Sequence, residues 1–283
     1  MILIADSGAT KTDWLFCDEA NSYIIKTEGI NPFHQQDDKI DGIIVNNLLP
    51  AISADCTLIT AVYFYGAGCL PTHVGGIERV LKKYFPKADI QINTDLLGAA
   101  RALCGHEPGI ACILGTGANS CLYDGEQIER NISPLGYILG DEGSGAYLGK
   151  RFVSDCFKEQ LPVFLRDGLL DEFHLSYTDI ITKVYKEPLA NRFLASLTPY
   201  IYKHREVPEV HDFLIDCFET FFRRNVLPYH SDLSISLTGS ISWFFQEEVK
   251  EAAKNLGLRT KLFLKNPIQG MASYHGVQHK GEI

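Results

Sequence analysis

The sequence lacks several patterns that mark common classes of protein. It contains no run of about 18 apolar residues, the length that a helix needs to cross a bilayer. Residues 1–6 carry no basic side chain before an aspartate appears, so no signal peptide is expected. The chain also has no short-period repeat and no low-complexity segment. These absences predict a cytoplasmic protein with no membrane partner.

An excess of basic residues is also absent. Lysine and arginine number 26 against 35 aspartates and glutamates, which gives a formal net charge of −9. No stretch of the chain gathers its lysines and arginines into a basic face, on which binding to the phosphate backbone of a nucleic acid depends. We therefore expect no nucleic-acid partner.

Closely paired cysteines are a third absence. None of the eight cysteines belongs to a CxxC motif, and most have apolar neighbours in the sequence. Zinc and iron–sulfur sites commonly use such local pairs, so the sequence gives no local sign of either. We expect reduced, buried thiols, as is usual for the cysteines of a cytosolic protein.

The chain does contain enough apolar material for a packed core. It has 283 residues, 46% of them hydrophobic, and this length favours two domains of about 150 residues each. Apolar spacing in the first third predicts three strands followed by alternating helices and strands. The predicted strands are 1–5, 12–18, 23–28, 58–65 and 88–92, and the predicted helices are 38–52, 72–85 and 96–104.

The pattern starts again beyond a boundary near residues 105–109. Three strands come first, a long helical stretch over 144–227 follows, and further strands and helices complete the second half. The predicted strands are 110–114, 120–123, 127–131, 233–237 and 260–263. Helix breaks are expected near Pro162, Gly168, Pro188 and Pro208, a helix over 243–256, and a last helix from about residue 267.

A turn of small residues, 6–12 (DSGATKT), separates the first two predicted strands. Small residues let the backbone turn tightly and point its N–H groups at an anion, and Thr10 and Thr12 add hydroxyl donors. Asp6 ends a strand and offers the oxygen ligands that Mg²⁺ prefers. The turn lacks the GxxxxGK[ST] pattern of a Walker A loop, and a strand follows it in place of a helix. Taken alone, it is also consistent with a plain hairpin turn.

A similar turn, 114–120 (LGTGANS), opens the second half between its first two strands. Two phosphate-type turns at the start of two similar halves indicate nucleotide binding more strongly than either turn does alone. A third turn, 237–240 (LTGS), follows a late strand and suits a backbone that passes close to a purine nucleoside. The alternative is a set of unrelated glycine turns.

Two aspartates stand where a helix is predicted to begin. Asp95 follows a strand within NTDLLGAA, and Asp141 lies in the glycine-rich string LGDEGSGA. Either could cap its helix, and Thr94 could do so in the first case. Alternatively, Asp95 is a carboxylate at the carboxyl edge of a sheet, where α/β proteins bind ligands, and it could accept a proton from an attacking hydroxyl.

In their order, these strings resemble those of the sugar kinase/Hsp70/actin superfamily. The chain looks most like N-acetylglucosamine kinase and the related BadF/BadG/BcrA/BcrD-type ATPases, chiefly through ILGTGANS and LGDEGSGAYLG. The resemblance runs from Asp6 to the helix that contains Gly270. It implies an α/β fold of two ribonuclease-H-like domains, each a mixed five-stranded sheet with helices, flanking a nucleotide and substrate cleft. The implied domains are 1–107 plus a C-terminal helix at about 268–283, and 108–267 with a helical insertion.

The resemblance implies nucleotide-binding roles at the matching positions. ATP and Mg²⁺ are the expected cofactors, with the metal at Asp6. Ser7 and Ala9 replace glycines that are usual in the first phosphate motif, and both are small enough to keep the turn. The nucleotide-binding positions are Asp6, Gly8, Thr10, Lys11 and Thr12 in the first phosphate motif, Thr116 and Gly117 in the second, and Gly239 and Ser240 in the adenosine motif.

The same resemblance implies that Asp95 is the catalytic base beside a bound sugar. Leu135 stands where kinases of this family often have a tryptophan, which changes the apolar surface available to the sugar. The implied substrate-binding positions are Asn31, Asp95, Ala118, Asn119, Pro134, Leu135, Gly136 and Asp141.

The sequence therefore predicts an ATP- and Mg²⁺-dependent kinase for the 6-hydroxyl of N-acetylglucosamine or a related amino sugar. We expect the protein to be a homodimer and its binding partner to be a small-molecule sugar substrate. One alternative is a kinase for glucosamine, N-acetylmuramic acid or another hexose. Another is an ATP-driven activator of a partner enzyme, as among the BadF/BcrA-type ATPases, although no cysteine spacing here marks the cluster of those that serve iron–sulfur partners. A third is a nucleotide-responsive sugar sensor without turnover, against which the presence of Asp95 argues.

Overall fold

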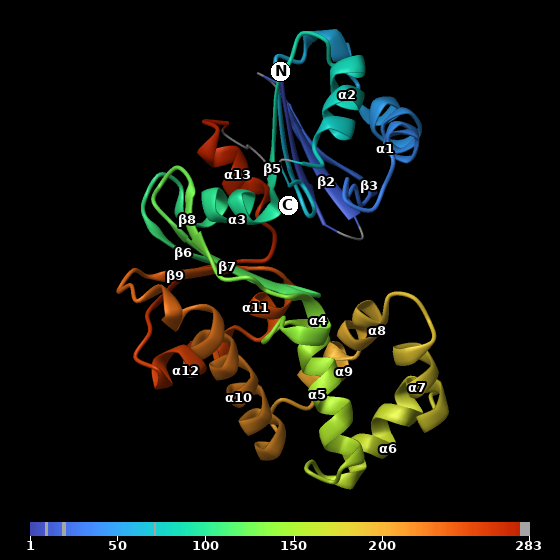
Figure 1. Ribbon diagram of the computed structural model, residues 1–283, viewed down its shortest axis with the longest axis vertical. Helices are drawn as coiled ribbons and strands as arrows, with labels where there is room; N and C mark the ends of the chain where they lie inside the picture. Colours follow the sequence, from blue (N-terminus) through green and yellow to red (C-terminus); the bar gives the residue numbers. More distant parts are fainter. Residues whose placement is uncertain (9–10, 19–20, 71, 278–283) are drawn as a thin grey trace. The chain divides into compact units, whose positions relative to one another are not determined.

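The computed structural model describes residues 1–8, 11–18, 21–70 and 72–277 (Figure 1). The chain divides into two compact units. Among the described residues, no helix combines the length and the apolar character that crossing a membrane requires. Unit 1 comprises Met1–Glu107, Asp124–Ile128 and the described part of Asn266–Ile283, and unit 2 comprises Pro108–Tyr123 and Glu129–Lys265.

Unit 1 is built on a mixed sheet of five strands in the order β3-β2-β1-β4-β5. Three antiparallel strands come first: β1 (Ile2–Ser7), β2 (Lys11–Cys17) and β3 (Ser22–Glu28). The strands β4 (Ala61–Gly66) and β5 (Asp89–Thr94) then continue the sheet parallel to β1. The central strands are buried on both faces, which requires helices on both sides of the sheet.

Helices of unit 1 cover the two faces of its sheet (Figure 1). On one face, α1 (Asp37–Ile43) and α2 (Gly75–Tyr84) bury an apolar core that includes Trp14. On the other face lie α3 (Asp95–Cys104) and α13 (Ile268–Tyr274), a helix from the far end of the chain. The segment after residue 265 therefore completes the unit that the N-terminal segment begins.

Glycines let α3 and α13 approach each other closely. A Cβ atom on Gly98 of α3 would lie 2.6 Å from Cε of Met271 in α13. A Cβ atom on Gly270 of α13 would collide with the carbonyl oxygen of Ala102 in α3. The contact between these two helices consequently depends on the absence of side chains at both glycines.

Unit 2 contains the second mixed five-stranded sheet, in the order β10-β9-β6-β7-β8. The central strand β6 (Gly109–Leu114) pairs antiparallel with β7 (Ala118–Tyr123) and parallel with β9 (Ile235–Thr238). Strand β10 (Thr260–Leu264) extends the sheet parallel to β9, and β8 (Ile128–Asn131) forms the other edge beside β7.

The helices of unit 2 pack around a core rich in buried phenylalanines, among them Phe152, Phe218 and Phe221. Most of them belong to the helical insertion between β8 and β9. The described helices are α4 (Gly136–Leu139), α5 (Gly145–Phe157), α6 (Val163–Glu172), α7 (Tyr177–Tyr185), α8 (Ala190–Ser196), α9 (Thr198–Lys203), α10 (Pro208–Asn225), α11 (Ser240–Phe244) and α12 (Gln246–Asn255).

The predicted fold class, two mixed five-stranded sheets with helices, is confirmed. The helix predicted over 38–52 differs in detail. It is α-helical only in α1 and continues as a π-helical segment, Ile44–Leu48, and a 3-10 turn, Leu49–Ala51. Pro50 lies in the first turn of that last segment, where a missing N–H is tolerated.

Two predicted helix boundaries were wrong. Gly168 does not break the helical stretch but lies inside α6. Its missing side chain leaves room for Tyr200, since a Cβ atom there would be 2.5 Å from the Tyr200 hydroxyl oxygen. The last helix, predicted to run to about residue 283, ends at Tyr274. Gly276 follows with a φ of 70°, the left-handed conformation that commonly terminates a helix.

Candidate active site

The carboxyl ends of three parallel strands meet at one edge of the sheet of unit 1. Ser7 of β1 pairs with Gly66 of β4, and Gly66 pairs with Thr94 of β5. Asp6 lies one residue before the end of β1, and Asp95 lies one residue beyond the end of β5. Both aspartates therefore stand at the sheet edge where α/β folds bind ligands.

Both aspartates are half-buried, and the pKa of each is raised. The pKa of Asp6 is raised to about 7, chiefly by burial and then by the charges of Asp95 and Asp13, while Lys11 lowers it. Burial also raises the pKa of Asp95, against the hydrogen bond that its carboxylate accepts from the N–H of Leu96 at 2.9 Å. The effect of Asp95 on Asp6 shows that the two charges interact, and a raised pKa makes each group a better proton acceptor.

Helix capping does not account for Asp95. The hydroxyl oxygen of Thr94 caps α3 by accepting a hydrogen bond from the N–H of Leu97 at 3.2 Å. Asp95 is the first residue of the helix, a position that favours a negative charge. The cap and the candidate base are thus neighbouring residues with separate tasks.

A backbone hydrogen bond joins the two described ends of the first phosphate turn. The N–H of Gly8 donates to the carbonyl oxygen of Lys11 at 3.0 Å. The ammonium group of Lys11 forms an ion pair with Asp13 at 2.7 Å, and 56% of its side chain is exposed. Thr10, a predicted phosphate contact, lies outside the described residues. Within the described part of the turn, Gly8 and Lys11 are the predicted contacts that remain accessible.

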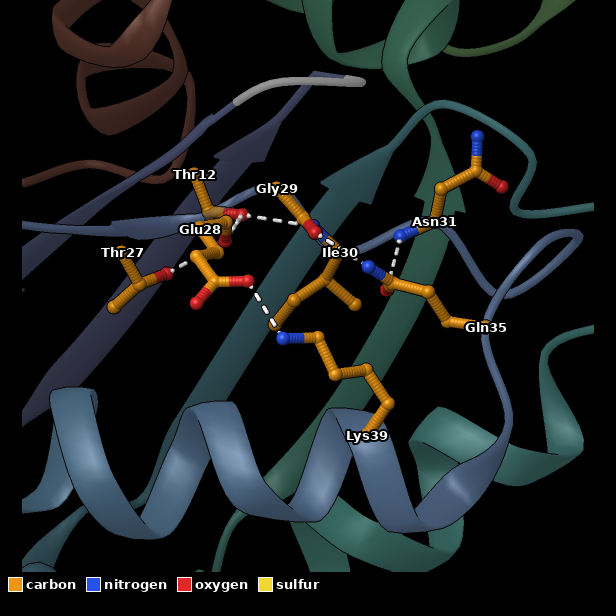
Figure 2. A network of polar contacts seen from close by, with 8 residues as sticks. All are labelled: Thr12, Thr27, Glu28, Gly29, Ile30, Asn31, Gln35 and Lys39. Carbon is orange, nitrogen blue, oxygen red and sulfur yellow. Dashed lines mark hydrogen bonds and ion pairs between the residues drawn. The ribbon is translucent and has the colours of Figure 1, made fainter. Parts of the chain in front are cut away.

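The hydroxyl group of Thr12 is buried and bonded within the protein (Figure 2). It lies 2.6 Å from the hydroxyl oxygen of Ser7, donates to the carbonyl oxygen of Glu28 at 3.1 Å and accepts from the N–H of Ile30 at 3.2 Å. Ser7 makes two further hydrogen bonds to the backbone of Ile30, both 2.9 Å long. A phosphate contact would break these bonds, so Thr12 is better described as joining β1, β2 and the end of β3.

The same network extends to Asn31, a predicted sugar contact. Its backbone N–H donates to Oε1 of Gln35 at 3.0 Å, and Nε2 of Gln35 donates to the carbonyl oxygen of Gly29 at 2.9 Å (Figure 2). Oδ1 of Asn31 accepts from the N–H of Phe33 at 3.0 Å, whereas its amide nitrogen points away from the network. Gly68 leaves room for this side chain, because a Cβ atom there would collide with Oδ1 of Asn31.

The second phosphate turn, between β6 and β7, is bonded to the start of α5. The N–H of Gly115 donates to the carbonyl oxygen of Gly117 at 2.9 Å and closes the turn. The N–H of Gly145 donates to the carbonyl oxygen of Gly115 at 2.8 Å, and that of Ala146 donates to the carbonyl oxygen of Thr116 at 3.1 Å. The side chain of Thr116 is exposed. Unit 2 therefore brings two of the predicted motifs together.

The predicted adenosine motif touches the same turn. Gly239 has a φ of 110°, which residues with a side chain rarely adopt. A Cβ atom on Gly239 would collide with the carbonyl oxygen of Leu114 and lie 3.3 Å from the nitrogen of Gly115. Ser240 is the exposed first residue of α11. The glycine therefore lets the adenosine motif lie directly against the second phosphate turn.

Asp141 is held in a left-handed conformation, with a φ of 55°, between α4 and α5. Its N–H donates to the carbonyl oxygen of Pro134 at 2.9 Å, and its carbonyl oxygen accepts from the N–H of Ser144 at 3.0 Å. Its carboxylate accepts a hydrogen bond from the N–H of Ala118. A Cβ atom on Gly117 would lie 3.1 Å from Oδ2 of Asp141. Because Ser144 caps α5, capping does not account for Asp141.

The pKa of Asp141 is raised to about 6. Burial is the main cause; the hydrogen bond from Ala118 and the charge of Lys150 lower the value, and the charge of Glu142 raises it. Glu142 itself is buried and forms an ion pair with Arg224 at 2.5 Å. The two neighbouring acids thus differ in role: Glu142 packs against α10, whereas Asp141 lies beside the turn.

The other predicted sugar contacts border Asp141 in unit 2. Oδ1 of Asn119 accepts hydrogen bonds from the N–H of Ser120 and from Nδ2 of Asn131, both at 2.9 Å. Leu135 caps the short helix α4 with a φ of 63°, is 61% exposed and directly precedes Gly136. The predicted positions 134–136 therefore include an apolar side chain that is open to a ligand.

Asp13 is a neighbour of the site that the motifs did not indicate. It pairs with Asp6 across β1 and β2, and the two side chains project from the same face of the sheet. In the observed β2, alternation of side chains places Asp13 on the face that carries Lys11, whereas the predicted strand began one residue later, at Thr12. No motif at this position drew attention to that alternation.

No protein-family model matches the chain, and no curated protein does. Among solved structures, one from Porphyromonas gingivalis, provisionally described as an N-acetylglucosamine kinase, has a TM-score of 0.94. The two sequences are 46% identical over 97% of this chain and 98% of that chain. This chain belongs to the N-acetylglucosamine kinase family.

Two more distant structures share the fold of this N-acetylglucosamine kinase family member. A second protein with the same provisional description, from Chromobacterium violaceum, has a TM-score of 0.74 at 18% identity, over 96% of this chain and 98% of that one. A ROK family glucokinase from Streptomyces griseus, in complex with glucose and AMPPNP, has a TM-score of 0.57 at 14% identity, over 96% of each chain. The fold is thus one that sugar kinases use.

Proposed function

We propose that this protein is an ATP-dependent sugar kinase that transfers the γ-phosphoryl group of ATP to the 6-hydroxyl of N-acetylglucosamine. The observation that carries the proposal is the half-buried Asp95 at the strand-end edge of unit 1, in a chain 46% identical to a protein described as such a kinase. Phosphoryl transfer depends mainly on positioning and charge stabilisation. The residues assigned below to the phosphates, the cation and the sugar are those that each unit can supply for positioning and charge stabilisation.

We assign the phosphates of ATP to the two turns. Unit 1 offers Gly8 and the exposed ammonium of Lys11, and unit 2 offers the exposed hydroxyl of Thr116. A hydrogen bond to a charged phosphate oxygen contributes about 1.5–3 kcal/mol. Gly239 and Ser240 adjoin the second turn and are assigned to the nucleoside.

The donors of the first turn fit Mg²⁺. Asp6 supplies carboxylate oxygens, the ligand type that this ion prefers. Beside it, the buried Oδ1 of Asp13 has no hydrogen-bond partner among the described residues. When bound, Mg²⁺ supplies positive charge that offsets the charge of the phosphates during transfer.

We assign Asp95 the role of general base. As the 6-hydroxyl oxygen of the sugar forms its bond to the γ-phosphorus, its proton passes to a carboxylate oxygen of Asp95. The bond from the γ-phosphorus to the bridging oxygen breaks, and ADP leaves. The raised pKa of Asp95 brings its proton affinity closer to what this transfer requires.

Polar groups from both units are assigned to the sugar. Asn31 offers a side-chain amide nitrogen, and the carboxylate of Asp141 accepts strong, charge-assisted hydrogen bonds from hydroxyl groups. Sites built on such bonds reject sugars that lack the matching hydroxyl. Leu135 offers apolar surface to an acyl group but no flat ring. Selection among amino sugars therefore rests on the polar contacts.

A sugar panel tests the proposal. The purified protein is incubated with ATP, Mg²⁺ and N-acetylglucosamine, glucosamine, N-acetylmuramic acid, glucose or no sugar, and ADP release is followed. Phosphorus NMR then identifies the position of the new phosphate. We expect N-acetylglucosamine 6-phosphate and little ADP without sugar. Sugar-independent ATP hydrolysis, or no phosphorylated sugar, would contradict the proposal and favour an activator ATPase.

We further propose that the protein acts as a cytoplasmic homodimer. Light scattering on the purified chain distinguishes a particle of about twice the chain mass of 31.6 kDa from a monomer. A monomer at assay concentration with full activity would contradict the dimer.

A further inference from the structure

A second carboxylate faces Asp6 across the first two strands of unit 1. Asp6 of β1 and Asp13 of β2 are directly opposed in the antiparallel register. Side chains of such a pair leave the same face of the sheet, with Cβ atoms about 4.5–5.5 Å apart. Two carboxylates at that separation repel each other, and either protonation of one of them or a cation beside them relieves the repulsion.

The bonds of Asp13 leave one of its oxygens unused. Asp13 is only 5% exposed. Its Oδ2 accepts a hydrogen bond from Nζ of Lys11 at 2.7 Å, whereas its buried Oδ1 has no partner among the described residues. A buried polar atom without a partner is costly and calls for an explanation, such as a bound ion.

The present partner of Asp13 is able to leave. Lys11 lies in the first phosphate turn, and 56% of its side chain is exposed. The described residues contain no group of three or more histidines, cysteines or acids that could hold a metal by themselves. Mg²⁺ commonly binds one or two carboxylates and fills its other positions with water and phosphate oxygens, so it does not need a larger group of acids.

We propose that Asp13 and Asp6 together hold the divalent cation, and that Lys11 is a counter-ion which the cation displaces. This inference rests on the proposed function for the identity of the nucleotide, but the cation site itself is built from unit 1 alone. Displaced from Asp13, the ammonium of Lys11 is free to meet the phosphates. The ion pair seen between Lys11 and Asp13 is then the resting state of the turn.

Binding of Mn²⁺ to the nucleotide-free, full-length protein tests this proposal. The loss of the free Mn²⁺ signal in electron paramagnetic resonance reports binding without any need for activity. Asp13→Asn should raise the dissociation constant tenfold or more, and Lys11→Met should lower it several-fold because a competing cation is removed. Asp89→Asn, which changes an exposed carboxylate of the same sheet, should leave it unchanged.

Three results would overturn the proposal: no Mn²⁺ binding by the wild-type protein, wild-type affinity in Asp13→Asn, or unchanged or weaker binding in Lys11→Met. If Asp13→Asn does not fold, Mn²⁺ binding by Lys11→Met still tests the proposal, because the side chain of Lys11 is exposed and its replacement leaves the core intact. The sugar panel reports separately on the proposed function. A wild-type protein that phosphorylates sugars while Asp13→Asn binds Mn²⁺ normally would refute the cation site alone.

Discussion

Asp95 is the residue on which turnover depends most in the proposed mechanism. Asp95→Asn keeps the shape of the side chain but cannot accept the proton of the sugar hydroxyl. We expect kcat to fall about 10²–10⁴-fold, while the affinity for ATP, measured by calorimetry, stays within a factor of about two. Near-normal turnover would show that another group removes the proton.

Asp141 offers a matched test of a sugar contact, because its left-handed backbone suits asparagine as well as aspartate. In Asp141→Asn, hydrogen bonds worth about 1.5–3 kcal/mol with a charge become neutral bonds worth about 1 kcal/mol. We expect the sugar KM to rise about tenfold or more, with ATP affinity unchanged. A lower melting temperature with an unchanged sugar KM would instead make Asp141 a structural residue.

The raised pKa of Asp141 also predicts how pH acts on the site. The carboxylate is charged above pH 6 and becomes protonated below it, so the wild-type sugar KM should rise as pH falls from 7 to 5. Since the folded state holds this proton more tightly than the unfolded chain, its contribution to stability is present at low pH and is lost as pH rises through about 6. Asp141→Asn should remove the part of both dependences that is due to Asp141 and melt at pH 7.5 no lower than the wild type does. A sugar KM that is flat between pH 7 and 5 in the wild type would contradict the assignment.

At the scale of elements, the two phosphate turns differ in which threonine is free. Thr116 is exposed, whereas the hydroxyl of Thr12 is bonded to Ser7, Glu28 and Ile30. Thr116→Val should weaken ATP binding roughly tenfold with little change in melting temperature. Thr12→Val should chiefly lower the melting temperature, because it removes the buried hydroxyl whose hydrogen bonds join β1, β2 and the end of β3. Calorimetric ATP titrations beside thermal melts check both variants, and the reverse pattern would restore the direct phosphate contact of Thr12.

The sequence was informative wherever local chemistry decides local structure. Strand ends, glycine turns and the helix start at Thr94 follow from apolar alternation, φ preferences and capping, and these carried the prediction of the sheets. It was uninformative where residues far apart in the chain determine the surroundings of a side chain. Tertiary packing decides which residues bury the hydroxyl of Thr12, and it places Tyr200 where only a glycine fits at position 168. Asp13 belongs to the same class, since its relation to Asp6 appears only through strand register.

At the scale of the whole molecule, α13 packs on the helix that begins with Asp95. Gly270→Ala places a Cβ against the backbone of Ala102, so we expect a lower melting temperature and a reduced kcat. Gly42→Ala in α1 is the control, because its Cβ meets nothing closer than 3.9 Å and should stabilise by about 0.4–1 kcal/mol. Circular dichroism melts and steady-state kinetics provide the measurements. Equal behaviour of the two variants would contradict a tight helix contact.

The division of the chain also sets an order of events during its synthesis. Unit 2 is complete once the ribosome has passed Lys265, whereas unit 1 still lacks α13 although its sheet was made first. Until α13 is in place, the surfaces of β4 at Tyr65 and of α3 at Gly98 lack the helix that packs against them, and such exposed apolar surface makes a nascent chain prone to aggregation. The unit that bears Asp95 therefore depends on contacts between the two ends of the chain to cover its sheet.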